Sequence, residues 1–142
     1  MKTDEQIKKI VTAAIRRKGI NLESWEYTRI WDEGKIEINS ELFKKCEFEE
    51  GELPILYSFI DSFNWTLFTT RAILFQNSGE YKKITLSEVK DYKLGNFKGH
   101  NNQSTEVMIV KTNDEKVHKL KYETGKQSMG AVYTIQTLLQ IN

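Results

Sequence analysis

The chain has 142 residues, which is the usual size of one domain and leaves little room for two independent cores. Hydrophobic residues make up 39% of it, enough to build a core, and 21 Lys and Arg nearly balance 20 Asp and Glu. The formal net charge of +1 argues against the broad basic field of a dedicated nucleic-acid-binding protein. We therefore expect no nucleic-acid partner.

Cysteine usage and hydropathy bear on the compartment. The single cysteine, Cys46, precludes an intramolecular disulfide and fits a reducing environment. The first residues show no secretory signal, and the longest apolar runs are far shorter than the ~20 residues that a membrane-spanning helix needs. We expect a cytoplasmic protein.

The N-terminus predicts a helix. Thr3 and Gln6 have the spacing of a capping box, and Gly19 after three basic residues suits a helix C-terminus. The basic end would also suit a membrane-surface helix, but a short apolar face without an aromatic ring favours docking on a core. The apolar stripe recurs at helical period: Ile7, Ile10, Val11, Ala14 and Ile15.

Residues 20–52 carry mixed signals. An aromatic cluster precedes a turn at 32–34, Lys35–Ile38 alternates like a short exposed strand, and Ser40 is placed to cap a brief helix. The acidic run 47–52 has adjacent carboxylates rather than calcium-loop spacing, so we expect a solvated connection and no metal site. The cluster consists of Trp25, Tyr27, Ile30 and Trp31.

Residues 53–123 predict strands, because short runs rich in β-branched and aromatic residues alternate with turn signals. The turns fall at 77–80 and 112–115, and a polar loop follows residue 94. This pattern indicates an antiparallel meander bent into a sandwich or barrel. The expected strands are Leu53–Ile60, Trp65–Thr70, Ala72–Gln76, Tyr81–Leu86, Lys90–Leu94, Glu106–Lys111 and Lys116–Tyr122.

A second helix is predicted at the C-terminus, where Thr124 and Gln127 again have capping-box spacing. Its apolar face would cover the open end of a small barrel. The expected fold class is thus α+β: a bent antiparallel β-barrel or sandwich of about seven strands, capped by this helix, with an additional N-terminal helix. We expect one structural domain, with 1–50 packed as an extension on a barrel formed by 51–142. The face is Ser128, Ala131, Val132, Ile135, Leu138 and Leu139.

Signals for catalysis are missing. His100 and His118 lie in different elements without Cys or His at zinc spacing, and no glycine-flanked nucleophile turn surrounds Cys46, which we expect to be a small apolar residue. The loop at 95–99 lacks the Gly-Lys-Ser/Thr ending of a phosphate loop. The sequence predicts no catalytic residue, no metal and no cofactor, and hence no enzyme.

Two sets of residues are candidates for binding. Lys82, Lys83 and Lys98 would hold an anionic group if they converge, or would simply form a solvated face that discourages edge pairing.

The second set is aromatic and basic: Trp25, Arg29 and Trp31. Aromatic residues and arginine are frequent interface anchors, so this set is a candidate partner-binding surface. The alternative is that these rings dock the N-terminal segment onto the strands.

Residues 53–139 resemble the bacterial pleckstrin-homology-like domains and, more loosely, the GRAM domains. Gly51-Glu52-Leu53 leads into a first strand, and a long strand-turn-strand run extends from Trp65 to Phe75. The stretch Ile84-Thr85-Leu86-Ser87-Glu88-Val89 is similar to the isoleucine-proline-tyrosine-serine-glutamate-isoleucine stretch of that family, although proline is missing and Leu86 replaces the frequent aromatic. These are packing motifs.

The resemblance implies a seven-stranded antiparallel barrel capped by the C-terminal helix, and a binding module without catalysis. It carries no ligand residues across, because Asp61-Ser62-Phe63-Asn64 in the first turn has no basic headgroup signature. The leading hypothesis is a cytoplasmic module that mediates a protein–protein interaction through a sheet edge or the aromatic segment. The alternatives are an immunity-type protein that neutralises a toxin, and peripheral binding to a membrane surface.

Overall fold

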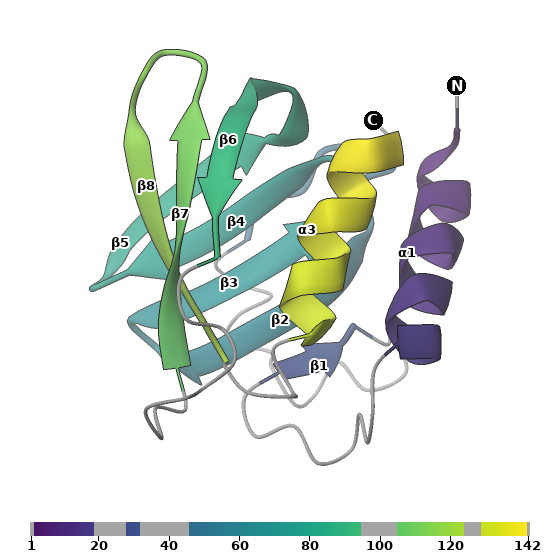
Figure 1. The fold of residues 1–142 in the computed structure, drawn as a ribbon, viewed down its shortest axis with the longest axis horizontal. Coiled ribbons are helices and arrows are strands. Elements are labelled where there is room, and N and C mark those ends of the chain that lie inside the picture. Colours follow the sequence, from purple (N-terminus) through teal and green to yellow (C-terminus); the bar gives the residue numbers. More distant parts are fainter. Residues whose placement is uncertain (1, 19–27, 32–45, 95–104, 124–128, 142) are drawn as a thin grey trace.

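The computed structural model describes residues 2–18, 28–31, 46–94, 105–123 and 129–141. Within these ranges it is an α+β protein with two α-helices and two antiparallel sheets (Figure 1). The helices are α1 (Asp4–Lys18) and α3 (Met129–Ile141). The larger sheet contains, in spatial order, β1 (Thr28–Ile30), β2 (Pro54–Asp61), β3 (Asn64–Thr69), β4 (Ala72–Asn77) and β5 (Glu80–Thr85). A 3-10 helix, η3 (Leu86–Glu88), leads to the smaller sheet of β6 (Val89–Lys93), β7 (Thr105–Thr112) and β8 (Val117–Glu123).

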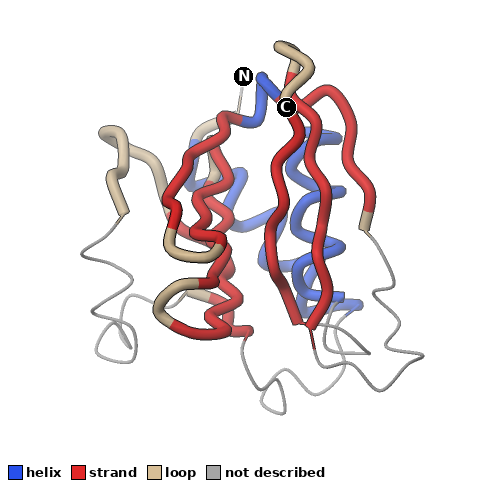
Figure 2. Tube along the Cα trace, turned by 90° about the vertical axis from the view of Figure 1, so that its left-hand side faces the viewer, coloured by secondary structure: helices blue, strands red, loops and turns tan. Residues whose placement is uncertain are grey.

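The described strands form two packed sheets rather than a closed barrel, so the sandwich alternative of the sequence prediction holds. The α+β class, the antiparallel strands of 53–123 and both terminal helices are confirmed. Strand β8 crosses the larger sheet and contacts β2, β3 and β4. Figure 1 shows the smaller sheet at a steep angle to the larger one, and Figure 2 shows the two as separate layers.

Local turn chemistry fixes the hairpin registers of the larger sheet. Ser78 and Gly79 both have positive φ, 53° and 87°, as the two-residue turn between β4 and β5 requires. In the β2–β3 turn, the Asp61 carboxylate accepts the Phe63 N–H at 2.8 Å. The two turns are joined, because the Gly79 N–H donates to the Phe63 carbonyl at 2.9 Å.

Strands β2, β3 and β4 are buried on both faces. Side chains alternate along a strand, so one set faces the smaller sheet and α3 while the other faces the opposite side. The inner set includes Leu56, Phe68 and Ile73, and the outer set includes Trp65 and Leu74. Burial of both faces explains why these strands read as nearly continuous apolar runs.

A strand that the sequence analysis did not predict, β1, extends the larger sheet. Thr28, Arg29 and Ile30 pair with Ser58, Tyr57 and Leu56 of β2. A three-residue strand is too short for a period-2 pattern to identify it. The predicted strand at 35–38, the brief helix from Ser40 and the Thr124–Gln127 capping box lie outside the described residues.

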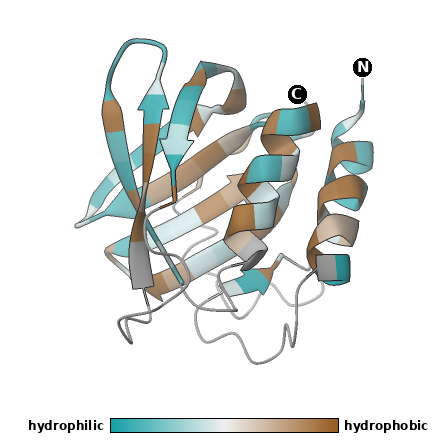
Figure 3. Cartoon of the chain, viewed as in Figure 1, coloured by the Kyte–Doolittle hydropathy of each residue, from teal (hydrophilic) through white to brown (hydrophobic). Residues whose placement is uncertain are grey.

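Helix α3 packs on β2 and lies against α1, which also contacts β2. Figure 1 shows the two helices side by side, with both chain ends at the same end of the pair, and Figure 3 shows hydrophobic residues along both. The Thr3–Gln6 capping box starts α1, with reciprocal hydrogen bonds of 2.9 and 3.2 Å. None of the described helices is long and apolar enough to cross a bilayer.

We predict that Ile135→Asp unfolds the domain. Ile135 is fully buried in the inner core, and an isolated buried charge costs several kcal/mol, comparable with the ~5–15 kcal/mol stability of a whole domain. Thermal melts followed by circular dichroism measure the effect. The matched control is Gln140→Asp on the exposed side of the same helix, which should melt close to the parent chain. A cooperative, parent-like melt of Ile135→Asp would contradict the capping role of α3.

Candidate functional site

The acidic segment before β2 is exposed at Glu47, Glu49, Glu50 and Gly51, as expected of a solvated connection, but its last residue, Glu52, is tied to the sheet. Glu52 is buried, and its carboxylate accepts hydrogen bonds from Lys83 Nζ at 2.9 Å, Thr69 Oγ1 at 2.5 Å and the Glu49 N–H at 2.9 Å. Lys83 Nζ also donates to the Glu47 carbonyl at 3.0 Å. Burial of the carboxylate is tolerated because a cation and two further donors satisfy it.

Arg71, in the turn between β3 and β4, joins the same segment to α1. Its guanidinium lies 2.7 Å from Asp4 Oδ2 and 3.3 Å from Glu49 Oε2. Hydrogen bonding to Arg71 is the main cause that lowers the pKa of Asp4 below its usual value. Thr70 Oγ1 donates to the same carboxylate at 2.6 Å. The start of α1, the acidic segment and the β3–β4 turn therefore meet at one point.

Of the predicted partner-binding residues, the two that the structure describes, Arg29 and Trp31, do not form an exposed surface. Trp31 is only 5% exposed and meets the Tyr57 ring edge-on at a centroid distance of 5.7 Å. Its backbone N–H donates to the Ile55 carbonyl at 2.7 Å. Trp31 therefore docks the segment onto the outer face of the sheet and is not a reachable anchor. Arg29 is half-buried on β1, and Trp25 lies outside the described residues.

The two described lysines of the predicted anion site, Lys82 and Lys83, do not converge either. Lys83 is engaged by Glu52, as described above, and lies on the outer face opposite Leu74. Lys82 is exposed, lies 3.5 Å from Glu80 and points to the other face. Lys98 lies outside the described residues. Strands β1 and β5 form opposite edges of the larger sheet, so Arg29 and the two lysines lie far apart across it.

The thiol of Cys46 occupies a packed position. Cys46 is half-buried against the outer cluster, and burial raises the pKa of its thiol to about 12. A thiol held protonated in this way is a poor nucleophile. Among the described residues, no group of three His, Cys, Asp or Glu side chains is arranged to hold a metal ion.

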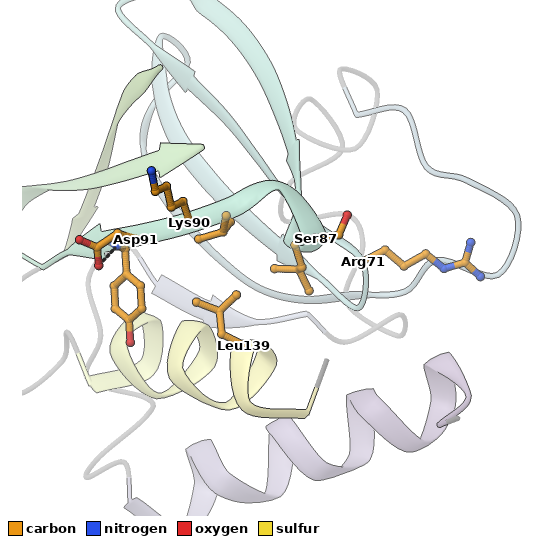
Figure 4. A pocket seen from close by; sticks show the side chains of 8 residues that line it. Arg71, Ser87, Lys90, Asp91 and Leu139 are labelled. Atoms are coloured by element: carbon orange, nitrogen blue, oxygen red, sulfur yellow. Dashed lines mark hydrogen bonds between the residues drawn. The ribbon is translucent and has the colours of Figure 1, made fainter. Parts of the chain in front are cut away.

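A groove between the smaller sheet and α3 is the candidate binding site. It encloses about 600 Å³ and is formed by η3, β6 and the C-terminal part of α3. Figure 4 shows Leu139 pointing from α3 towards the strand, with Arg71 at one end and Asp91 at the other. The lining side chains are Arg71, Leu86, Ser87, Val89, Lys90, Asp91, Tyr92 and Leu139.

Hydrogen bonds hold the wall formed by η3 in place. The Leu86 N–H donates to the Arg71 carbonyl at 2.9 Å, and Glu88 closes η3 by accepting the Thr85 N–H at 3.2 Å. The β7–β8 turn adds two bonds, from the Asn113 N–H to the Glu88 carbonyl at 2.9 Å and from Asn113 Nδ2 to the Ser87 carbonyl at 3.1 Å. The groove is thus built on fixed backbone.

Strand β6 presents an edge beside this groove. In the part of the chain that the structure describes, β6 pairs with β7 alone, so its other side has no strand partner. The Tyr92 N–H donates to Asp91 Oδ1 at 2.8 Å rather than to another strand. Directly after β6, the Leu94 carbonyl accepts a hydrogen bond from the Tyr122 hydroxyl of β8, which ties the end of β6 to the sheet.

Comparison with protein-family models, with curated proteins and with solved structures gives no match. The function of the groove therefore has to be inferred from its own geometry. The sequence predicted a strand at Lys90–Leu94 and placed Leu139 on a helix face, but nothing in the sequence indicated that they meet. That contact depends on how α3 crosses the sheets.

We predict that Lys83→Met destabilises the chain by about 3 kcal/mol. The substitution leaves the Glu52 carboxylate buried without its cation, and breaking a buried pair in this way costs about 3–5 kcal/mol. Urea denaturation measures the change in free energy of unfolding. The control is Lys82→Met at the neighbouring exposed position, expected to remain within about 0.5 kcal/mol of the parent. Equal effects of the two substitutions would show that the ion pair does not hold the acidic segment.

We also predict a stability loss on acidification that depends on His118. Its Nδ1 is buried without a hydrogen-bond partner, and its ring meets Phe75 edge-on at 6.1 Å. Burial, followed by the charge of Lys82, lowers its pKa below 6.5, whereas Asp114 and Glu88 act in the opposite direction.

Because the folded-state pKa lies below the unfolded value, the unfolded chain takes up the proton first. The contribution of His118 is present above about pH 6.5 and is lost as the pH falls below it. Urea midpoints at pH 7.5 and 5.5 should differ in the parent and in His100→Gln, and differ less in His118→Gln. An unchanged pH dependence in His118→Gln would refute the assignment.

Proposed function

We propose that the chain is a non-catalytic binding module of the pleckstrin-homology-like class, which mediates a protein–protein interaction in the cytoplasm. The observation that carries this proposal is the groove between the free side of β6 and α3. The order of β2–β5, β6–β8 and a closing helix supports the class, because the resemblance implies seven antiparallel strands and a C-terminal helix, although the described strands form two sheets and not the implied barrel.

The mode of binding that suits the groove is the addition of an extended segment of a partner to β6. In such complexes, backbone hydrogen bonds along the strand edge provide affinity and alternate side chains enter pockets that provide specificity. The apolar lining by Leu86, Val89 and Leu139 would receive aliphatic side chains, and the ring of Tyr92 adds to this surface. The hydrogen-bonded backbone of η3 favours binding, because this wall of the groove loses little conformational entropy when a partner binds.

An anionic ligand or a membrane surface has less support. Lys83 is committed to Glu52, and Lys82 lies near Glu80. Asp61 holds an exposed carboxylate in the β2–β3 turn, with a pKa lowered chiefly by its hydrogen bond to the Phe63 N–H. The two described candidates, Lys82 and Lys83, therefore do not converge on a shared anion site. Trp31, one of the aromatic residues that suggested an N-terminal contact surface, is part of the core.

We predict that filling the groove abolishes partner retention. Ser87 is exposed and lines the groove, so Ser87→Trp should block it without placing a charge in the core. Tagged parent and variant chains are used to purify partners from cells that naturally produce the protein, with quantitative mass spectrometry as the measurement. A partner of the parent should be at least about ten-fold depleted with Ser87→Trp, as expected when about 1.4 kcal/mol or more of binding free energy is lost.

The matched control is Lys119→Trp, which places the same ring on the exposed part of β8. It should retain the partner. Retention by both variants would refute the groove as the binding site, and a parent chain that retains no protein at all would contradict the proposed function. Parent-like thermal melts of both variants exclude unfolding as the cause of a loss.

A further inference from the structure

We propose that Asp91 closes the β6 edge in the free protein and selects a partner strand that carries a basic residue. This inference rests on the proposed function, since it concerns the chemistry of the segment that enters the groove. It goes beyond it by naming a specificity-determining residue and the charge of the partner.

The Asp91 side chain accepts a backbone hydrogen bond that a strand added to β6 would need. It lies on β6 at the groove and is exposed, and its Oδ1 accepts the Tyr92 N–H at 2.8 Å (Figure 4). A backbone N–H held by a side chain is not offered to a partner strand. An added strand can therefore use this donor only after the carboxylate has moved away from it.

Among the charged side chains that line the groove, Asp91 is the one that forms no ion pair with another described residue. Of the two cations that line the groove, Lys90 forms an ion pair with Glu115, and Arg71 pairs with Asp4 and Glu49. Lys111 is opposite Asp91 in the β6–β7 register, but its Nζ lies 2.8 Å from Glu115 Oε2. Among the described residues, no cation lies within ion-pair distance of Asp91.

A basic residue on the partner strand would both pair with the Asp91 carboxylate and free the Tyr92 N–H that this carboxylate holds. Its ammonium or guanidinium group would attract the Asp91 carboxylate and release the Tyr92 N–H for the new ladder. Side chains at alternate positions of the same strand would enter the apolar part of the groove, lined by Leu86, Val89 and Leu139. An acidic strand would instead be repelled by the Asp91 carboxylate, and the Tyr92 N–H would remain hydrogen-bonded to Asp91.

Edge protection alone makes a different prediction. Charged side chains on an exposed strand edge reduce unwanted pairing with any strand, including that of a second copy. If that were the whole role of Asp91, Asn in its place would promote self-association. It would not change any preference between basic and acidic peptides.

The test uses the full chain labelled with nitrogen-15 and two heptapeptides with blocked ends. Both peptides have valine at alternate positions, and the remaining positions are lysine in one and glutamate in the other. Amide signals of β6 follow binding in titrations at low salt. We expect the lysine peptide to shift these signals and to bind about five-fold or more tightly than the glutamate peptide, in line with the small energies of single surface charge pairs.

Asp91→Asn should reduce that preference to less than about two-fold, whereas Glu80→Gln, which removes an exposed carboxylate from the larger sheet, should keep it. Equal binding of the two peptides to the parent chain would overturn the proposal. So would an Asp91→Asn chain that self-associates, as measured by analytical ultracentrifugation, and still prefers the lysine peptide.

Failure of this inference is distinguishable from failure of the proposed function. If neither peptide shifts the β6 signals while the cellular partner remains sensitive to Ser87→Trp, the role of Asp91 is wrong and the groove is still the binding site. If the partner is insensitive to Ser87→Trp as well, both are wrong.

Discussion

The architecture depends on one constraint: the central strands of the larger sheet must be covered on both faces. The inner face is covered by the smaller sheet and α3, and these layers build the main core. The outer face carries Trp65, Leu67 and Leu74, which would expose a large apolar surface without a further layer. Trp31, Cys46 and Phe48 contribute that layer. These three described residues are thus part of the packing of the larger sheet.

The acidic segment at the outer face also forms ion pairs with Lys83 and Arg71, two cations that the sequence alone would leave available for binding a ligand. Lys83 and Arg71 hold the acidic segment against the sheet through Glu52 and Glu49, and Arg71 simultaneously holds the start of α1 through Asp4. The Glu52 pair is buried and hydrogen-bonded, so the removal of one partner is expected to cost far more than the loss of a surface pair. The balanced composition therefore reflects, in part, ion pairs that hold this domain together.

The local features of the fold were predictable, because periodicity, capping and turn chemistry act within a few residues. The Thr3–Gln6 capping box and the turn at Ser78 and Gly79 are examples. The two-faced sheet was not recognised, because a continuous apolar run does not reveal what covers each face. For the same reason Glu52 was expected in solvent, and Trp31 could not be separated from an interface anchor. The groove was missed entirely, since η3, β6 and Leu139 meet only through the packing of α3.

Two edge strands, β1 of the larger sheet and β6 of the smaller sheet, differ in the side chains that hold their backbone groups, and this difference bears on function. The larger sheet is extended by β1, whose Thr28 N–H donates to the buried Glu123 carboxylate at 3.0 Å and whose Thr28 hydroxyl lies 3.0 Å from that of Ser58. That edge is built into the structure by side chains from β2 and β8. On β6 the edge donor of Tyr92 is held only by the exposed carboxylate of its neighbour, Asp91, beside a groove with an apolar lining. A side chain in solvent exchanges its hydrogen bond readily, because the alternative partner is water. The hydrogen bond at the β6 edge can therefore be broken at a small cost in free energy. Opening the β1 edge would instead leave the buried Glu123 carboxylate without the Thr28 N–H.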